Sequence, residues 1–236
     1  MSDGRRMAYK RLNDRQRKAA LDGFLDSASQ IDGLAVSLVF PKSIPHVWAP
    51  PGILAIWQGS VGLKGKWTHS AFERLMRTAT LISLLIGTFG KDGQNVYWIS
   101  DEDAIFATPE RSADAARLMS QLANLHVRHQ PGELGIGTVT IDPGDRAEED
   151  LCAVSDLIGG ALAEICTDMN SGETGETNRS QRWLSANLSW KAQEVGGWIA
   201  KRHAGLRIAT FMFENDGQNQ LGVRRLDLEP SALWHP

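Results

Sequence analysis

Short apolar runs alternate with amphipathic helical patterns along most of this chain, and that alternation limits the possible folds more than any other feature. The first run, residues 34–40 (LAVSLVF), is rich in branched side chains and is closed by Pro41. It follows residues 13–32, where apolar side chains recur at the spacing of one helix face. A run that is apolar at nearly every position is typical of a strand buried on both faces, so we predict a helix followed by a buried strand.

The same order recurs twice downstream. Residues 95–100 (NVYWIS) and 135–141 (GIGTVTI) are strand candidates, and a helical pattern precedes each of them. The helix before the second of these strands is expected to begin at Pro109 with Thr108 as its cap, and a fourth helix is expected over residues 147–166. Strands that alternate with helices predict an α/β fold with at least partly parallel strands.

Residues 41–67 form a long connection between the first strand and the next helix. Pro and Gly residues punctuate it, and one short helical turn is expected at residues 53–57. Irregular connections of this length are uncommon in compact domains, which favours either a functional lid or an insertion.

The composition changes beyond Thr167, where the sequence becomes rich in Gly, Ser, Thr and Asn and predicts an exposed linker. The remainder predicts one helix and then a hairpin built from residues 206–213 and 221–228. We therefore divide the chain into an α/β domain, residues 1–167, and a C-terminal helix and hairpin extension, residues 168–236, which packs on the same domain.

Tryptophan is unusually frequent, with eight Trp against two Tyr. Trp183, Trp190 and Trp198 fall in the late helical stretch, at spacings of seven and eight residues. Such spacings return to one side of a helix, which favours aromatic side chains that pack in a core. A platform on which nucleic-acid bases stack is the alternative explanation.

Positive charge gathers at the start of the chain. Residues 1–18 hold seven basic and two acidic side chains, a charge of +5 in a chain whose net charge is −3. Such a segment can contact nucleic acid or can simply be the solvated face of a first helix. Under the first interpretation the contacting residues are Arg5, Arg6, Lys10 and Arg11.

Several function classes are excluded by missing motifs. The phosphate-binding, dinucleotide-binding, zinc-peptidase and serine-elbow motifs do not occur, and the Cys and His residues lack zinc-ligand spacing. The longest apolar stretch, residues 80–88, is about half of the roughly 20 residues that a membrane span needs. The N-terminus lacks a secretory apolar core, so we expect a cytoplasmic protein without a membrane partner, with Cys152 and Cys166 reduced.

Carboxylates are the remaining candidates for chemistry. Asp101 and Asp103 follow the second predicted strand and are two residues apart, so both face one side while the chain stays extended. That end of an open α/β sheet is where ligands bind. In the fourth predicted helix, Glu149 and Asp156 are seven residues apart and share a face. Asp150 follows Glu149 directly and lies beside that face.

Asp156 is the most informative of these acids. It stands among apolar residues in mid-helix, beside Gly159 and Gly160, each of which costs about 1 kcal/mol relative to Ala in a helix interior. A carboxylate in such a place needs a partner, and a divalent cation shared with a strand-end acid would supply one. Each acid also has a structural explanation of its own: Asp101 and Asp103 can cap a turn, the acids of the first helical turn can complement the helix dipole, and Asp156 can pair with an Arg.

The order of these segments resembles a known family. LAVSLVFPK, VYWISDED, GIGTVTID and EDLCAVSDLIGGAL occur in this order, and over residues 10–164 they look like the later part of the ribonuclease H-like "domain of unknown function 3800" family. Its members typically have an Asp at the end of a central strand and a late helix of the type Q-x-A-D-L-x-x-G. Asp101 corresponds to the strand-end acid, and residues 154–160 correspond to the helix, with Val154 in place of the usual Gln.

The resemblance implies a ribonuclease H-like mixed sheet flanked by helices, with a Mg²⁺- or Mn²⁺-dependent nuclease centre. Asp101 and Asp156 would be the primary ligands, with Asp103, Glu149 and Asp150 as helpers. Two metal ions about 3.5–4 Å apart would activate water and stabilise the leaving oxygen of a phosphodiester.

The family also opens with a D-E-S-G strand that supplies a catalytic Asp, and this motif has no counterpart here. Either the chain begins downstream of that strand, or it is a catalytically degenerate relative that serves as a scaffold or interaction protein. A sheet that lacks its first strand has an open edge, which favours association with a second copy or with another protein.

Overall fold

The computed structural model describes most of the chain, and the description below is restricted to those residues. They are residues 6–44, 47–48, 50, 52–101, 104–126, 132–139, 146–171, 188–201, 203–215 and 221–226. The chain forms two compact units, Met1–Ser43 with Glu149–Pro236, and Ile44–Glu148. We call them unit 1 and unit 2 and describe each by itself.

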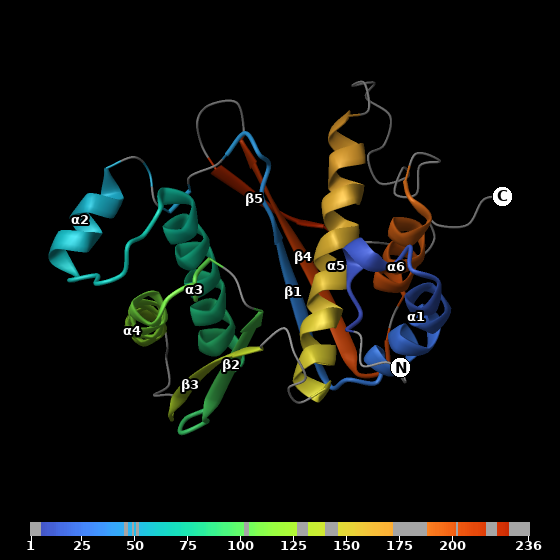
Figure 1. Cartoon of the computed structure of the whole chain (residues 1–236), viewed down its shortest axis with the longest axis horizontal. Coiled ribbons are helices and arrows are strands. Elements are labelled where there is room, and N and C mark those ends of the chain that lie inside the picture. The colour runs from blue at the N-terminus through green and yellow to red at the C-terminus, as the bar shows by residue number, and fades with distance from the viewer. Residues whose placement is uncertain are drawn as a thin grey trace. The chain divides into compact units, whose positions relative to one another are not determined.

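Unit 1 contains a three-stranded mixed sheet and three long helices (Figure 1). Strand β1 pairs with β4 in parallel, and β4 pairs with β5 in antiparallel orientation, so the strand order is β1-β4-β5. The elements are the 3₁₀ turn η1 (Tyr9–Arg11), α1 (Arg15–Ala28), β1 (Gly33–Val39), α5 (Arg146–Ser171), α6 (Trp190–Ala200), β4 (Leu206–Asn215) and β5 (Leu221–Leu226).

Alternate residues of the two parallel strands supply the sheet side of the unit 1 core. Ala35 is in register with Ile208, and both pack against the apolar cluster that α1, α5 and α6 share. The strand β1 is half-buried along its whole length rather than buried on both faces, because it lies at the edge of this sheet. Association through such an edge stays a prediction.

The late tryptophans divide between core and margin. Trp198 is buried in the unit 1 core and Trp190 is half-buried against it, which confirms the packing role for these two. The helix α5 runs to Ser171, and residues 172–187 are not described. Trp183 and most of the predicted linker therefore lie outside the described residues.

Unit 2 contains two parallel strands and three helices. Its elements are α2 (Ile53–Ser60), α3 (His69–Phe89), β2 (Val96–Asp101), α4 (Pro109–His126) and β3 (Leu134–Val139). The core forms where α3 meets α4 and includes Phe72, Leu75 and Leu118, with Trp67 from the preceding loop. The chain is therefore of mixed α/β type, and the predicted parallel pairing is confirmed in both units.

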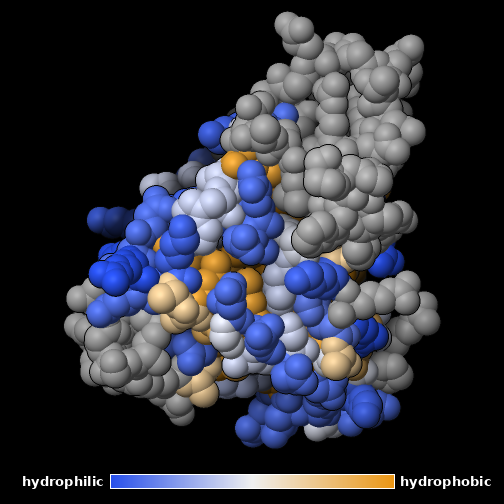
Figure 2. Space-filling model, turned by 90° about the vertical axis from the view of Figure 1, so that its right-hand side faces the viewer, coloured by the Kyte–Doolittle hydropathy of each residue, from blue (hydrophilic) through white to orange (hydrophobic). Residues whose placement is uncertain are grey.

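The molecular surface is largely hydrophilic where Figure 2 shows it, on the side that carries α1 and α6. Hydrophilic residues there surround a small apolar area. Among the described residues, no helix is long and apolar enough to cross a membrane.

Candidate nucleic-acid-binding site

Asp101 is the last residue of β2, as the sequence predicts. It is in register with Val139, the last residue of the parallel strand β3, so the carboxyl ends of both strands meet at one edge. That edge is where open α/β sheets bind ligands. Asp103 lies outside the described residues.

Arg111 connects this edge to the loop before α3. Its guanidinium donates to the carbonyl oxygen of Ala104, three residues beyond Asp101, over 2.8 Å. The same group donates through Nε to the carbonyl oxygen of Lys66 over 2.9 Å, and through a second nitrogen to that oxygen as well. It also lies 5.3 Å from the centre of the Trp67 ring, within the range of a cation–π contact. One arginine thus fixes the loop beside the carboxyl end of β2.

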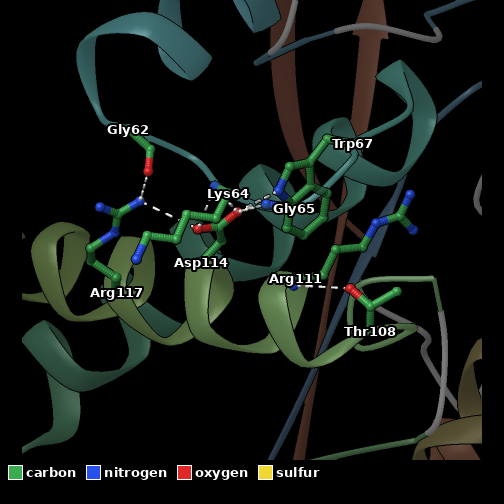
Figure 3. A network of polar contacts seen from close by, with 8 residues as sticks. All are labelled: Gly62, Lys64, Gly65, Trp67, Thr108, Arg111, Asp114 and Arg117. Carbon is green, nitrogen blue, oxygen red and sulfur yellow. Dashed lines mark hydrogen bonds and ion pairs between the residues drawn. The ribbon is translucent and has the colours of Figure 1, made fainter.

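Asp114 of α4 holds the rest of this loop, residues 62–67 (Figure 3). Its side chain is 3% exposed and accepts from the backbone N–H groups of Lys64 (3.0 Å) and Gly65 (2.8 Å), and from Nε1 of Trp67 (2.9 Å). Arg117 donates to the same carboxylate over 3.3 Å and to the carbonyl oxygen of Gly62 over 2.9 Å. A single buried carboxylate therefore satisfies donors from three loop residues and one helix residue.

These contacts keep Asp114 ionised. Burial alone would favour the neutral acid, but the Trp67 indole, the Gly65 and Lys64 N–H groups and the Arg117 charge outweigh it and hold the pKa of Asp114 below its usual value. The loop conformation is thus linked to a negative charge in the interior of unit 2.

Two glycines allow the loop to lie this close to α4. Gly62 has φ of +63°, a left-handed conformation that side chains disfavour. A Cβ at Gly65 would lie 2.8 Å from Cγ and 3.1 Å from the backbone nitrogen of Arg111, too close for any larger residue without a shift of the loop.

Four cationic residues belong to this loop and to the helix that holds it. We call this set the loop–α4 cluster, and it consists of Lys64, Lys66, Arg111 and Arg117. Both lysines are exposed, and the Arg117 side chain is 40% exposed. In Figure 3 the side chains of Lys64 and Arg117 extend to the same side of Asp114. Glu110, exposed in the first turn of α4, is the other acidic residue of this helix.

The partner of Asp156 in unit 1 is a backbone N–H group. Oδ2 of Asp156 accepts from the nitrogen of Tyr9 over 2.8 Å, although the two residues are 147 positions apart. Further along α5, Glu164 accepts from the Tyr9 hydroxyl (2.9 Å) and from the nitrogen of Ser189 (2.7 Å). Two carboxylates of α5 thus fasten the N-terminal turn to the core.

The neighbouring glycines have different roles. A Cβ at Gly160 would overlap the ring of Tyr9 and lie 2.8 Å from its Cβ, whereas a Cβ at Gly159 would meet nothing within 4 Å. Gly160 is therefore explained by the close approach of Tyr9, and the structure gives no steric reason for Gly159.

The acids predicted to share a metal are divided between the two units. Asp101 belongs to unit 2, whereas Glu149, Asp150 and Asp156 belong to unit 1. Glu149 is buried and Asp150 is exposed. Within the part of the chain that the structure describes, no three His, Cys, Asp or Glu side chains group closely enough to hold a metal ion. A shared Mg²⁺ or Mn²⁺ stays a prediction.

The basic N-terminal segment is attached to unit 1 rather than extended from it. Met7, Tyr9 and Leu12 are buried in the core, and they leave Lys10 and Arg11 exposed. Arg6 is half-buried, and Arg5 lies outside the described residues.

Two lysines, Lys18 of this segment and Lys191 of α6, lie against aromatic rings. Nζ of Lys191 is 4.4 Å from the centre of the Tyr9 ring, and Nζ of Lys18 is 4.3 Å from that of Trp190. Lys191 thus adds one charge beside Tyr9 to those of the segment. Contact of the N-terminal segment with nucleic acid stays a prediction.

Comparison with known proteins adds nothing to these observations, since no family model, no curated protein and no solved structure matches the chain.

We expect the two glycines of α5 to respond in opposite ways to the same substitution. Gly160→Ala should lower the free energy of unfolding by about 1–3 kcal/mol, because the new methyl group displaces Tyr9. Gly159→Ala should raise it by up to about 1 kcal/mol, because Ala favours a helix interior and the site has room. Urea denaturation of both variants measures the difference, and equal effects would contradict the role assigned to Tyr9.

Asp114→Asn should destabilise the protein by about 2–3 kcal/mol at neutral pH, because one amide cannot accept from all four donors. The pKa of Asp114 is lowered by folding, so its ionised form contributes stability above the unfolded pKa of about 3.9, and this contribution is lost as the pH falls. The stability gap between wild type and variant should therefore be constant at neutral pH and narrow progressively in acid. If the difference in stability between wild type and variant stays the same down to the pH of acid unfolding, the ionised form of Asp114 does not hold the loop.

Proposed function

We propose that this chain binds nucleic acid through the phosphate backbone, at the loop–α4 cluster beside the carboxyl end of β2. The observation that supports this is the presence of four cations, Lys64, Lys66, Arg111 and Arg117, in the loop that Asp114 holds and on the helix α4 that carries Asp114. Phosphate contacts from Lys and Arg supply most of the non-specific affinity of proteins for nucleic acid. A surplus of cations at a ligand-binding edge is suited to such contacts.

The charge of the two arginines remains available to an anion. Arg111 donates to the carbonyl oxygens of Lys66 and Ala104, which hold its position without cancelling its charge. Arg117 shares Asp114 with three uncharged donors, and its guanidinium stays partly exposed. Fixed cations lose less conformational entropy on binding than mobile ones, so the hydrogen bonds that hold Arg111 and Arg117 also favour affinity.

The cluster is notable because the chain as a whole carries a net charge of −3. A local positive surface on an acidic protein attracts a polyanion at that surface and repels it elsewhere. This would direct a nucleic-acid strand to the edge where Asp101 lies. The exposed Lys10 and Arg11 of unit 1 are a second candidate contact.

We further propose that the bound strand is cleaved with the help of Mg²⁺ or Mn²⁺, as the family resemblance implies. Asp101 is placed at the end of β2, and carboxylates are ligands that these ions prefer. When bound, such an ion would activate water and stabilise the leaving oxygen. Asp156 would be the second primary ligand, with Asp103, Glu149 and Asp150 as helpers. The Oδ2 atom of Asp156 also accepts a hydrogen bond from the backbone nitrogen of Tyr9. A catalytically degenerate scaffold or interaction protein is the alternative.

Charge reversal tests the binding surface. Lys64→Glu with Lys66→Glu should lower the affinity for a single-stranded oligonucleotide at least about tenfold at low salt. The log–log slope of affinity against salt should become shallower by about 0.7 for each phosphate that the variant no longer neutralises. Fluorescence anisotropy over a salt series measures both effects.

The control for this test is Lys91→Glu, a single charge reversal at an exposed lysine ten residues before Asp101 and before β2 begins. Its affinity should stay close to that of the wild type. An equal fall in affinity for the control would show that only the overall charge matters.

Cleavage is tested with Asp101→Ala and Asp156→Asn in the presence of Mn²⁺, on single- and double-stranded DNA and RNA. Asn at position 156 can still accept the Tyr9 N–H, so the fold is kept while the anionic ligand is removed. Both variants should lose cleavage and keep oligonucleotide binding. Activity that survives both substitutions would rule out this mechanism, and binding without cleavage in the wild type would favour the degenerate alternative.

A further inference from the structure

Tyr97 is the most exposed aromatic residue of the described strands. It lies on β2 and is 63% exposed. The next residue, Trp98, faces the other side of the sheet, where its ring lies 5.2 Å from that of Phe106 in an edge-on contact. The strand therefore supplies one half-buried aromatic ring, which contacts Phe106, and one exposed ring on the opposite face.

Two glycines of the neighbouring strand make room for the Tyr97 ring. Gly135 is in register with Tyr97, and Gly137 follows two residues later on the same face of β3. A Cβ at Gly135 would lie 2.9 Å from Cε2 of Tyr97 and closer still to Cδ2. A Cβ at Gly137 would lie 3.1 Å from Cζ and would overlap the hydroxyl oxygen.

These positions fix how the ring lies. Gly135 faces the Cδ2–Cε2 edge of the ring, and Gly137 lies at its hydroxyl end. The ring is thus held along one edge and at its hydroxyl end, and 63% of the residue is exposed. An aromatic ring that is held at its edge and otherwise largely exposed is suited to stacking against another planar group.

We propose that Tyr97 is a stacking platform for an unpaired base, which makes single-stranded nucleic acid the ligand of this site. The inference rests on the proposed function and specifies its substrate class. Base-on-aromatic stacking tolerates any sequence, but the base must be free of its complementary strand to reach the ring.

The platform and the phosphate-binding cluster lie along one strand. Asp101 is four residues beyond Tyr97 on β2, a separation of about 13 Å in an extended chain. Arg111 is bound to Ala104 just beyond that end. A strand of nucleic acid stacked on Tyr97 can therefore extend along β2 toward the cations and Asp101.

The test compares a short oligothymidylate with a DNA duplex of the same length, by fluorescence anisotropy with the full chain. Tyr97→Ala should weaken binding of the single strand about tenfold, within the range that such stacking contributes, and leave duplex binding within about twofold. Tyr97→Phe keeps the ring and should bind like wild type. Leu84→Ala, at an apolar side chain of α3 that is 51% exposed, is the matched control and should have no effect.

Gly137→Ala tests the geometry while Tyr97 itself is kept. The new methyl group would lift the ring from β3, so single-strand affinity should fall toward that of Tyr97→Ala. Thermal unfolding of each variant shows whether the protein is still folded. If Tyr97→Ala lowers only the melting temperature and leaves single-strand affinity unchanged, the ring merely covers the glycine backbone and the platform is wrong.

The outcomes separate this inference from the proposed function. Loss of binding in the Lys64→Glu, Lys66→Glu variant together with unchanged binding in Tyr97→Ala would overturn the platform alone. Equal weakening of single strand and duplex by Tyr97→Ala would also overturn it, because a duplex offers no free base. Failure of the wild-type chain to bind either oligonucleotide would overturn both proposals.

Discussion

The buried carboxylate of Asp114 is the interaction on which the candidate site depends. An ionised carboxylate is costly in a protein interior unless its hydrogen-bonding capacity is filled. Here the donors are two backbone N–H groups, an indole N–H and a guanidinium, all within 3.3 Å. Because most of these donors come from the loop before α3, the same bonds that stabilise the charge also fix Lys64 and Lys66 beside α4.

The connection before α3 is held in the same way nearer its start. Glu73 of α3 is buried and accepts from the backbone nitrogens of Val47 (2.8 Å) and Trp48 (3.1 Å), while Arg77 pairs with it at 2.8 Å. The helix α2 lies between these two anchored points of the chain. Since a carboxylate fastens each side of it, the long connection behaves as an attached part of unit 2 rather than as a loose insertion. In unit 1, Asp156 and Glu164 do the same for the N-terminal turn.

Local structure is predictable from the sequence because short-range signals determine it. Asp14 and Thr68 cap α1 and α3 through their side chains, and Thr108 precedes α4 as expected. The strand runs agree with β1, β2 and β3 to within a few residues, because apolar continuity and Gly or Pro boundaries identify strands. Asp101 could be placed at a strand end for the same reason.

The long-range bonds that build the site could not be predicted in this way. Lys64 and Asp114 are 50 positions apart, and Tyr9 and Asp156 are 147 apart, so no periodicity connects them. The sequence predicts that Asp156 needs a partner, and the structure gives it the backbone N–H group of Tyr9. The cation at Asp156 stays a prediction. The Gly and Lys residues within 62–66, and the two glycines that face Tyr97, are the local signals in the sequence that point to the loop and to the exposed ring.

The central claim is that single-stranded nucleic acid lies along β2, from Tyr97 to the loop–α4 cluster. Photochemical cross-linking of an oligonucleotide that carries photoreactive thymine, followed by mass spectrometry of the linked peptides, tests it most directly. We expect cross-links within residues 62–67 and at Tyr97, and we expect them to disappear when unlabelled single strand competes. Cross-links confined to the N-terminal segment, with none in unit 2, would contradict the claim.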